Sequence, residues 1–266
     1  MPTDTDAEVV DLLATGDITP VGRIVDSSNG ALLCSVAGGG EDVLVIHKLE
    51  AHERPLWDYP DGTLVARERA AYLVSAAGGF DVVPPTVLRD GPLGHGSVQL
   101  WVGPLEGEPD PLVDVRAADD VPDGWLVVVE GETPSGAPVV VCHSPEPALR
   151  TVAVLDAVIN NSDRKGGHLM RDGDLVRGCD HGVSLGVAPK LRTVLWGWAG
   201  EPLPPADLAR LEVLLEALRA GLADELEELL TAAEVRAVRS RAERLLRTRT
   251  HPLPQPGWPA IPWPAL

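Results

Sequence analysis

One stretch of the chain, residues 156–185, constrains the fold more than any other part. It overlaps an apolar segment, residues 147–160, whose composition predicts a buried helix, and it continues into the polar run NSDR at positions 161–164. The turn sequence RDGD at positions 171–174 then predicts a hairpin whose second strand runs to Asp180. A buried helix, a polar loop and a hairpin in this order bring several polar side chains to one end of a domain.

The types and spacing of these side chains suit phosphoryl transfer. One aspartate must meet the attacking hydroxyl, and a second must hold the metal that neutralises the nucleotide phosphates. Kinase catalytic loops have the form D-x-x-x-x-N, followed by a hairpin and D-x-G. Asp163 to His168 has the first spacing, and Asp180 begins the second pattern. We therefore assign Asp163 as the catalytic aspartate and Asp180 as the magnesium ligand, against the alternatives of an Asx-turn and a plain strand-end turn.

His168 stands where the kinase pattern has an asparagine. Magnesium prefers oxygen ligands, whereas imidazole suits softer transition metals. We expect His168 in the site in one of two roles: as a ligand of a second cation, which shifts preference toward manganese, or as a hydrogen-bond partner of a phosphate beside a single metal. A structural or solvent-facing histidine is the alternative.

Two basic residues follow the catalytic aspartate, and we group Arg164 and Lys165 with it as catalytic residues. They could hold a phosphate or the catalytic loop itself, and Arg164 could instead pair with Asp180. The glycines at 166 and 167 would let the backbone pass close to a substrate.

The N-terminal part of the chain predicts a sheet that ends in a lysine. We expect a helix over residues 6–15 and strands over 21–26, 31–37 and 42–48. Lys48 ends the third strand, and Glu68 lies in the first turns of a helix expected over residues 64–77. Such a lysine neutralises the α- and β-phosphates of a nucleotide while the glutamate keeps it aimed. A solvent-facing lysine beside an unrelated helix is the alternative.

Two further segments are candidates for nucleotide contacts. Backbone N–H groups at Ser27 and Ser28 could form an anion nest over the phosphates, although an ordinary hairpin turn explains the same sequence equally well. The expected nucleotide hinge consists of Gln99, Leu100, Trp101 and Val102. Backbone groups of this hinge would pair with adenine, and the indole would either stack nearby or be plain core.

The remaining segments complete a second, helical half. Proline and acidic residues at 103–123 predict a linker, and residues 125–130 and 138–143 predict a hairpin. Helices are expected from residue 203 onward, the last of them rich in arginine, for which a solvated face is favoured over an anion-docking face. The proline-rich tail, residues 251–266, cannot form a helix or a central strand, and we expect Trp258 and Trp263 to pack against the C-lobe.

Taken together, the sequence resembles the phosphatidylinositol 3-/4-kinase-like branch of the kinase superfamily, whose members carry N-x-D-R in the catalytic loop and D-x-G at the metal strand. The resemblance is strongest to a small actinobacterial family of that branch. It rests on the ordered segments RPLWDYPDGTLVARERAAYLVS, VPPTVLRDGPLG, NNSDRKGGHLM and LRTVLWGWAGEPL. It implies an α+β, two-lobed protein-kinase-like fold, with a small β-rich N-lobe and a larger, mostly helical C-lobe, and it implies ATP and Mg²⁺ (or Mn²⁺) as cofactors.

We expect an N-lobe over residues 1–103, a C-lobe over 104–250 and a Pro/Trp-rich tail over 251–266. The expected reaction moves the γ-phosphate of ATP to an alcohol acceptor, which could be an inositol-type lipid, a small molecule or a protein Ser/Thr. A nucleotide-binding pseudokinase, which His168 motivates, and AMP transfer on the same fold are the alternatives.

The composition limits the partners and the compartment. A net charge of −18 argues against nucleic-acid binding, which needs clustered Lys and Arg, and against adsorption to an anionic membrane. The three cysteines have no metal-binding spacing, and their odd number favours reduced thiols. No signal peptide or membrane-length apolar run is evident in the sequence. We therefore expect a cytoplasmic protein without stable membrane insertion whose partners are ATP and an unidentified hydroxyl acceptor.

Overall fold

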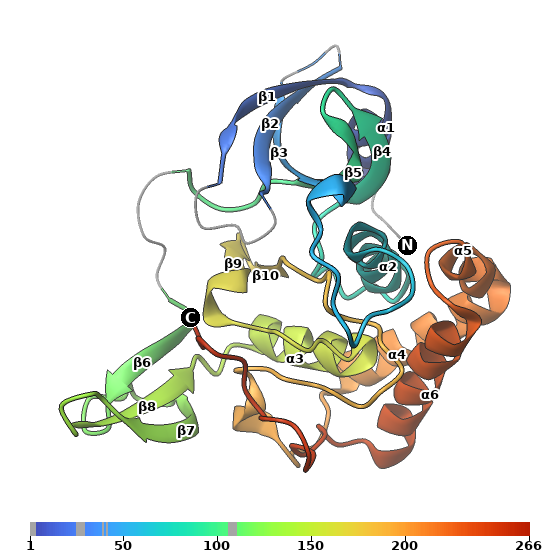
Figure 1. Cartoon of the computed structure of the whole chain (residues 1–266). Coiled ribbons are helices and arrows are strands. Elements are labelled where there is room, and N and C mark those ends of the chain that lie inside the picture. Colours follow the sequence, from blue (N-terminus) through green and yellow to red (C-terminus); the bar gives the residue numbers. More distant parts are fainter. Residues whose placement is uncertain (1–3, 25–29, 39, 41, 106–110) are drawn as a thin grey trace.

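The computed structural model describes residues 4–24, 30–38, 40, 42–105 and 111–266. Figure 1 shows a β-rich part at the top, built on one sheet, and a mostly helical part below it. The fold is therefore α+β with two lobes, as expected from the sequence. None of the helices in these ranges is both long and apolar enough to span a lipid bilayer.

The N-lobe is an antiparallel sheet of five strands in the order β1-β2-β3-β5-β4. The strands are β1 (Asp17–Arg23), β2 (Leu32–Ala37), β3 (Val43–Leu49), β4 (Thr86–Gly91) and β5 (Gly94–Leu100). Alternate residues of β2 are buried, and they pack with Leu13 of α1 (Asp4–Thr15) in a small core of their own. In β3 the same alternation buries His47 and Leu49 and leaves Lys48 on the other face of the sheet.

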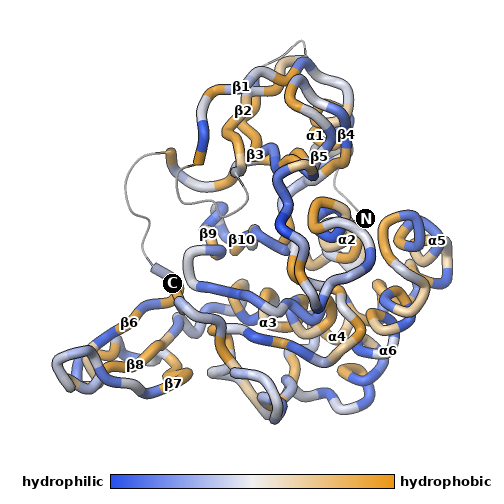
Figure 2. Tube along the Cα trace, viewed as in Figure 1, coloured by the Kyte–Doolittle hydropathy of each residue, from blue (hydrophilic) through white to orange (hydrophobic). Residues whose placement is uncertain are grey.

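The helix α2 (Leu64–Ala77) joins the two lobes. Its first N–H groups are capped by the Glu53 carboxylate, which accepts from Leu64 N at 2.9 Å and from Val65 N at 2.7 Å. The connection from β3 to α2 that carries Glu53 is largely hydrophilic (Figure 2). Buried Arg67 donates to Glu234 Oε1 at 2.6 Å and so ties α2 to the last helix of the C-lobe.

The C-lobe is built around α3 (Pro147–Ile159), which is buried on nearly all sides because its residues are almost all apolar. The helices packed around it are α4 (Pro205–Ala217), a π-turn η4 (Leu218–Leu222), α5 (Ala223–Glu227) and α6 (Ala232–Thr248). The helical run is broken at Gly221, whose φ of 128° is open to glycine but not to most side chains. Residues 171–174 form the expected hairpin turn between β9 (Leu169–Asp172) and β10 (Leu175–Gly178).

The segment expected to be a linker contains a strand, which corrects that prediction. The strand β6 (Val113–Ala117) pairs with β8 (Pro138–His143), and β8 also pairs with β7 (Leu126–Glu132). This three-stranded sheet, in the order β6-β8-β7, projects from the lower left of the molecule (Figure 1). The signal for β6 was the alternation of apolar and polar residues in VDVRA, which was obscured by the prolines and acidic residues around it.

The tail follows the C-lobe without forming a helix or a strand, as expected. Ala260 O accepts from Thr193 N at 3.1 Å and from the Trp196 indole at 2.8 Å. Trp258 stacks on Trp57 with ring centroids 6.1 Å apart. Trp263 is 84% exposed, so the prediction that it packs against the C-lobe is wrong. The tail is therefore held by hydrogen bonds to its backbone and by Trp258, and not by Trp263.

Candidate active site

Three separate segments meet at the ammonium group of Lys48. Lys48 Nζ donates a short hydrogen bond to Glu68 Oε1 of α2 and a second one to Asp180 Oδ1 at 2.8 Å. Burial alone would lower the pKa of Lys48, but the carboxylates of Asp180 and Glu68 more than offset this and raise it. The expected pairing of Lys48 with Glu68 is therefore present, and the lysine is charged.

Asp180 lies two residues beyond the end of β10, in a turn with φ 61° that aspartate tolerates better than most residues. The ammonium of Lys48 holds the pKa of the Asp180 carboxyl well below its usual range against the opposing effect of burial. The neighbouring His181 N–H donates to Glu68 Oε2 at 3.0 Å. Glu68 thus fixes both the lysine and the backbone after the aspartate.

Arg164 is fully buried and pairs with Asp156 of α3 rather than with Asp180. Its Nε lies 3.0 Å from Asp156 Oδ2 and its Nη2 lies 3.0 Å from Asp156 Oδ1. A further donor reaches Cys179 O at 2.9 Å. Burial would lower the pKa of Arg164, but Asp156 raises it. Of the roles expected for Arg164, these contacts favour holding the loop, and a fully buried guanidinium does not touch a ligand in the cleft.

Asp163 is the carboxylate of the loop that remains open. Its N–H donates to Asn161 Oδ1 at 3.0 Å, and its side chain, 30% exposed, lies 3.2 Å from Lys165 Nζ. Burial raises the pKa of the Asp163 carboxyl in spite of the nearby Lys165. Lys165 therefore contacts Asp163 directly, whereas Arg164 supports the loop that carries Asp163 from its buried side.

His168 lies beside Asp180, with His168 Nε2 3.4 Å from Asp180 Oδ2. Burial lowers the pKa of His168 to about 4, so the ring is neutral at physiological pH and keeps a lone pair available. Its Nδ1 is buried and has no hydrogen-bond partner among the described residues. His168 thus lies beside Asp180, and this geometry fits either a weak metal ligand or a phosphate contact, so its role stays a prediction.

A cavity of about 100 Å³ opens where these groups converge. Its walls include Lys48 and Glu68 from the N-lobe side, and Asp163, Asp180 and Gly182 from the C-lobe side. A Cβ on Gly182 would lie 3.2 Å from Leu64 Cβ, so the glycine allows the loop to pass close to α2. Both aspartates assigned from the sequence therefore face one space.

The expected hinge residues lie at the end of β5 and directly after it, and several of their donors are already used within the protein. The Gln99 side chain is buried and donates to Thr86 Oγ1 at 2.8 Å. Leu100 N donates to Pro85 O and Trp101 N donates to Leu44 O. The Trp101 indole donates to Gly103 O at 2.9 Å. These bonds commit the N–H groups of Leu100 and Trp101 to the protein, so neither is available to adenine, and the role of Val102 as a hinge donor stays a prediction. Ser27 and Ser28 lie outside the described residues.

The two loop glycines approach the tail rather than an open substrate space. A Cβ on Gly166 would lie 2.7 Å from Leu266 Cδ2, and Gly166 N donates to Ala265 O at 2.8 Å. The end of the tail therefore rests on the catalytic loop, close behind Lys165.

Sequence reasoning missed several residues that support this site. Asp156 holds Arg164 and also accepts from Asn161 Nδ2 at 3.0 Å. Tyr59 bonds both Ser162 Oγ and Val183 O at 2.9 Å, joining the catalytic loop to the loop that follows Asp180. A lone acidic residue in an otherwise apolar helix was a visible signal for Asp156, because a buried carboxylate needs a partner. No local pattern pointed to Tyr59.

The donor set is suited to a nucleotide-bound cation rather than to a resident metal. Within the described parts of the chain, no three His, Cys, Asp or Glu side chains converge closely enough to hold a metal alone. Mg²⁺ in phosphoryl-transfer sites is usually held by one or two carboxylates together with phosphate oxygens and water. Asp180, ionised and half exposed, fits that requirement, with His168 beside it.

The fold matches that of known kinases. The crystal structure of the Golgi casein kinase superposes with a TM-score of 0.51 at 13% identity, over 93% of this chain and 75% of the other. The crystal structure of the Golgi casein kinase with Mn/ADP bound gives 0.53 at 14% identity, over 93% and 76%. At such low identity the similarity shows a shared kinase-like fold.

Sequence comparison shows the family. No protein-family model matches the chain. Protein Rv2133c of Mycobacterium tuberculosis is 45% identical over 265 residues, which cover 96% of this chain and 94% of the relative. Such identity across nearly the whole length of both proteins establishes common descent, and the chain belongs to the same family as Protein Rv2133c.

Proposed function

We propose that this protein is an ATP-dependent phosphotransferase that moves the γ-phosphate of ATP to a hydroxyl acceptor. The observation that carries the proposal is the meeting of Lys48, Glu68 and Asp180, which come from three separate segments, at one cavity that Asp163 also lines. A phosphate-binding cation, a metal-binding carboxylate and a candidate base are the parts that phosphoryl transfer requires. A kinase-like fold with a solved neighbour bound to Mn/ADP supports the same reaction.

Each residue of the cavity then has a role. The Lys48 ammonium contacts the α- and β-phosphates, and Glu68 keeps its flexible side chain aimed. Asp163 orients the acceptor hydroxyl and takes its proton late in the reaction, for which a raised pKa is favourable. Lys165, 3.2 Å from Asp163, lies where the transferred phosphoryl group would pass. Val102 N–H would meet the adenine.

Asp180 and His168 would hold the divalent cation together with the phosphates. The bound cation would offset the phosphate charge, which allows the nucleotide to be desolvated in the cleft. Asp180 currently accepts from Lys48, so nucleotide entry replaces part of that ion pair with contacts to phosphate. The imidazole of His168 favours Mn²⁺ over Mg²⁺ relative to an asparagine at the same place.

The resemblance to the phosphatidylinositol 3-/4-kinase-like branch supports a finer proposal about the acceptor class. It rests on the N-x-D-R and D-x-G patterns at residues 161–164 and 180–182. We propose an inositol-type alcohol as the first acceptor to test, followed by other small alcohols and protein Ser/Thr.

Transfer assays with ATP labelled separately at the α- and γ-phosphate test the reaction. Each acceptor class is offered in turn, and transfer to water is measured in its absence. Label on an acceptor or in released phosphate from the γ-position supports a kinase, whereas label from the α-position means AMP transfer. Nucleotide binding without release of either label means a pseudokinase, and the absence of nucleotide binding rejects all three functions.

Asp180→Ala tests the metal-dependent part of ATP binding, and Glu216→Ala is its matched control. Since Asp180 supplies the carboxylate that holds the cation, Asp180→Ala should lose the metal-dependent part of ATP affinity. Glu216→Ala, on the exposed surface of α4, should leave it unchanged. Equal calorimetric affinities for ATP in Asp180→Ala and wild type, with and without magnesium, would contradict the assigned metal site.

A further inference from the structure

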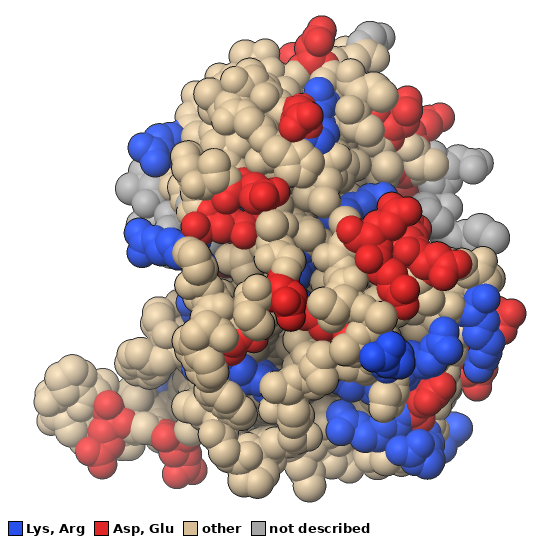
Figure 3. All heavy atoms as spheres, turned by 45° about the vertical axis from the view of Figure 1, so that its right-hand side comes forward, with Lys and Arg blue, Asp and Glu red and all other residues tan. Residues whose placement is uncertain are grey.

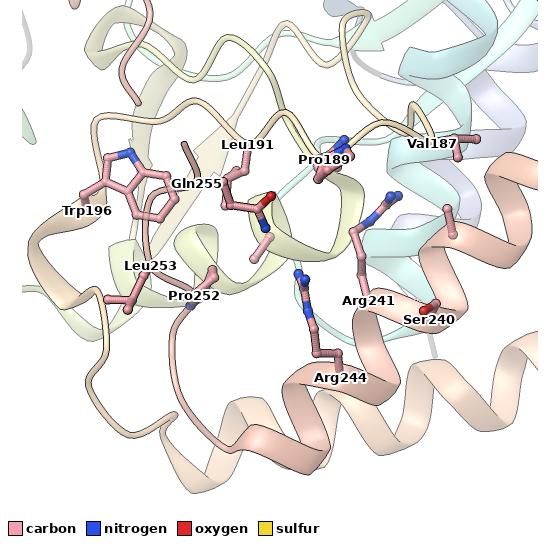
Figure 4. A pocket seen from close by; sticks show the side chains of 13 residues that line it. Val187, Pro189, Leu191, Trp196, Ser240, Arg241, Arg244, Pro252, Leu253 and Gln255 are labelled. Carbon is pink, nitrogen blue, oxygen red and sulfur yellow. The ribbon is translucent and has the colours of Figure 1, made fainter. Parts of the chain in front are cut away.

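A second cavity, of about 180 Å³, lies in the C-lobe between α6, the loop that follows Gly182 and the start of the tail. Figure 4 shows Arg241, Arg244 and Gln255 directed into it, with Trp196 at one side and Pro189 at another. A water needs only about 10–15 Å³ of such space, so the cavity has room for a larger ligand. It shares no lining residue with the cavity of the candidate active site.

Arg241 is held rigidly at the wall of this cavity and retains an unused donor. Its Nε donates to Val158 O at 2.7 Å and its Nη1 donates to Gly186 O at 3.1 Å. The third nitrogen, Nη2, is buried and has no hydrogen-bond partner among the described residues. A buried charged donor without a partner is costly, and an anion in the adjoining cavity would offset that cost.

Arg244 supplies a second guanidinium to the same space. Within the described residues it makes no hydrogen bond and no ion pair. It lies close enough to Arg241 that its charge, after the larger effect of burial, lowers the pKa of Arg241 to about 10. The lining contains Ser240 and Gln255, which can also donate, and no aspartate or glutamate. Two cations therefore share a cavity with no internal counter-charge.

The charge distribution of the whole molecule makes this cavity exceptional. The net charge is −18, yet Figure 3 shows Lys and Arg side chains gathered over the lower right of the face in view, with acidic side chains above them. Five arginines lie within α6, and their positions are Arg236, Arg239, Arg241, Arg244 and Arg247. An anion bound between two adjacent unpaired arginines would offset the cost of placing their charges side by side.

We propose that this cavity is a binding site for a phosphate group, either inorganic phosphate or the terminal phosphate of a small phosphorylated molecule, held by the guanidinium groups of Arg241 and Arg244 and the polar groups of Ser240 and Gln255. Planar guanidinium groups match phosphate oxygens in pairs, which favours phosphate over a point-like halide. The site is separate from the nucleotide phosphates of the proposed function, because its walls belong wholly to the C-lobe and tail.

Calorimetric titration of the full chain with inorganic phosphate, and in parallel with glycerol 3-phosphate, tests this site and distinguishes the two sources. Arg244→Gln removes one guanidinium and should weaken binding about 10- to 100-fold, as expected for charge-assisted hydrogen bonds. The matched control is Arg247→Gln, the same change at an exposed position of α6 that does not line the cavity, and it should bind as wild type does.

A Lys48→Met variant separates this site from the candidate active site, and it should retain phosphate binding in full. Arg244→Lys keeps the charge but loses the forked geometry, so its affinity should fall between those of wild type and Arg244→Gln. The thermal midpoints of the Arg244 variants without phosphate should be no lower than that of wild type, because Arg244 makes no hydrogen bond or ion pair among the described residues and its charge opposes that of Arg241. Loss of binding in Lys48→Met, equal affinity in Arg244→Gln and wild type, or no binding of either anion at about millimolar concentration would each overturn the proposal.

Discussion

Asp156 and Asp163 belong to the same short stretch of chain, yet their surroundings are opposite. Asp156 is fully buried in α3, where Arg164 and Asn161 satisfy its oxygens. Asp163 is 30% exposed at the cavity, and among the described residues it forms an ion pair with Lys165 at 3.2 Å. Burial without full compensation raises the pKa of Asp163, whereas Asp156 sits in a closed network.

The difference separates two uses of a charged side chain. A carboxylate whose acceptor sites are all filled by the protein can only position its neighbours, and Asp156 positions Arg164, which in turn holds the catalytic loop. A carboxylate with free acceptor sites that face a cavity can receive a ligand or a proton. Replacing the first should therefore cost stability, and replacing the second should cost activity.

The largest expected effect follows from Asp163→Asn. The amide keeps the size of the side chain but cannot take a proton, so kcat of the proposed phosphotransferase should fall by about 10²–10⁴, the range for a positioned base. Because the ionised carboxylate is disfavoured by burial, its removal should not lower the free energy of unfolding. Steady-state kinetics, ATP titration and urea unfolding of the same variant measure the three quantities.

Two results would break the comparison at this point. Wild-type activity in Asp163→Asn would move catalysis to another residue. Loss of ATP binding together with a lowered midpoint of unfolding would make Asp163 structural, like Asp156.

Asp156→Ala should have the next largest effect, and on the opposite property. It leaves the guanidinium of Arg164 buried with its carboxylate partner removed, which typically costs about 3–5 kcal/mol of folding free energy. Urea unfolding of Asp156→Ala beside Asp163→Asn compares the two carboxylates directly. A loss below about 1 kcal/mol would mean that Arg164 finds another partner and that the network is not what holds the loop.

The residues at the cavity could be selected from the sequence, whereas those that support them could not. Asp163, Asp180 and Lys48 were selected because phosphoryl transfer requires particular residue types at a regular spacing, and the structure brings all three to one cavity, while their roles stay predictions. The helix at residues 64–77 could be predicted to the residue, because Thr63 caps its start and glycine follows its end.

The supporting contacts could not be predicted, because they join residues far apart in the chain. Arg67 pairs with Glu234 across the two lobes, and Tyr59 reaches the catalytic loop from the β3–α2 connection. Local patterns carry no information about such pairs. The strand β6 was missed for a different reason: five residues of clear alternation lie inside a segment whose composition is typical of a linker.

A buried histidine extends the comparison of buried and exposed charged groups to a group that is buried in its neutral form. His251 is 4% exposed, and its Nε2 accepts from Arg150 Nε at 3.1 Å, which requires an unprotonated nitrogen. Burial, and then Arg150, lower the pKa of His251 to about 4. Between this value and about 6.5 the unfolded chain binds the proton more strongly than the folded chain, so stability falls as the pH falls.

From pH 7 to pH 5 this residue should account for about 2 kcal/mol of lost folding free energy. His251→Asn removes the titrating group, so its stability should fall less steeply over that interval than that of wild type, whatever its stability at pH 7. Urea unfolding at pH 7, 6 and 5 gives both slopes. Parallel slopes for the variant and wild type would show that His251 is protonated at no extra cost in the folded protein.

The smallest effect on folding free energy is expected for an arginine–carboxylate pair on the surface, which has the same charged groups as Arg164 and Asp156 but lies in solvent. Arg219 Nη1 lies 3.2 Å from Glu216 Oε2, and the two side chains are 60% and 75% exposed. Water screens this pair and solvates either partner when the other is removed, so Glu216→Gln should change the free energy of unfolding by less than about 0.5 kcal/mol. A loss comparable to that of Asp156→Ala would show that burial does not decide which ion pairs hold this fold. A negligible loss of folding free energy in Glu216→Gln, beside a large loss in Asp156→Ala, would show that an arginine–carboxylate pair stabilises this fold only when it is buried. Burial is also the property that distinguishes Asp156 from Asp163.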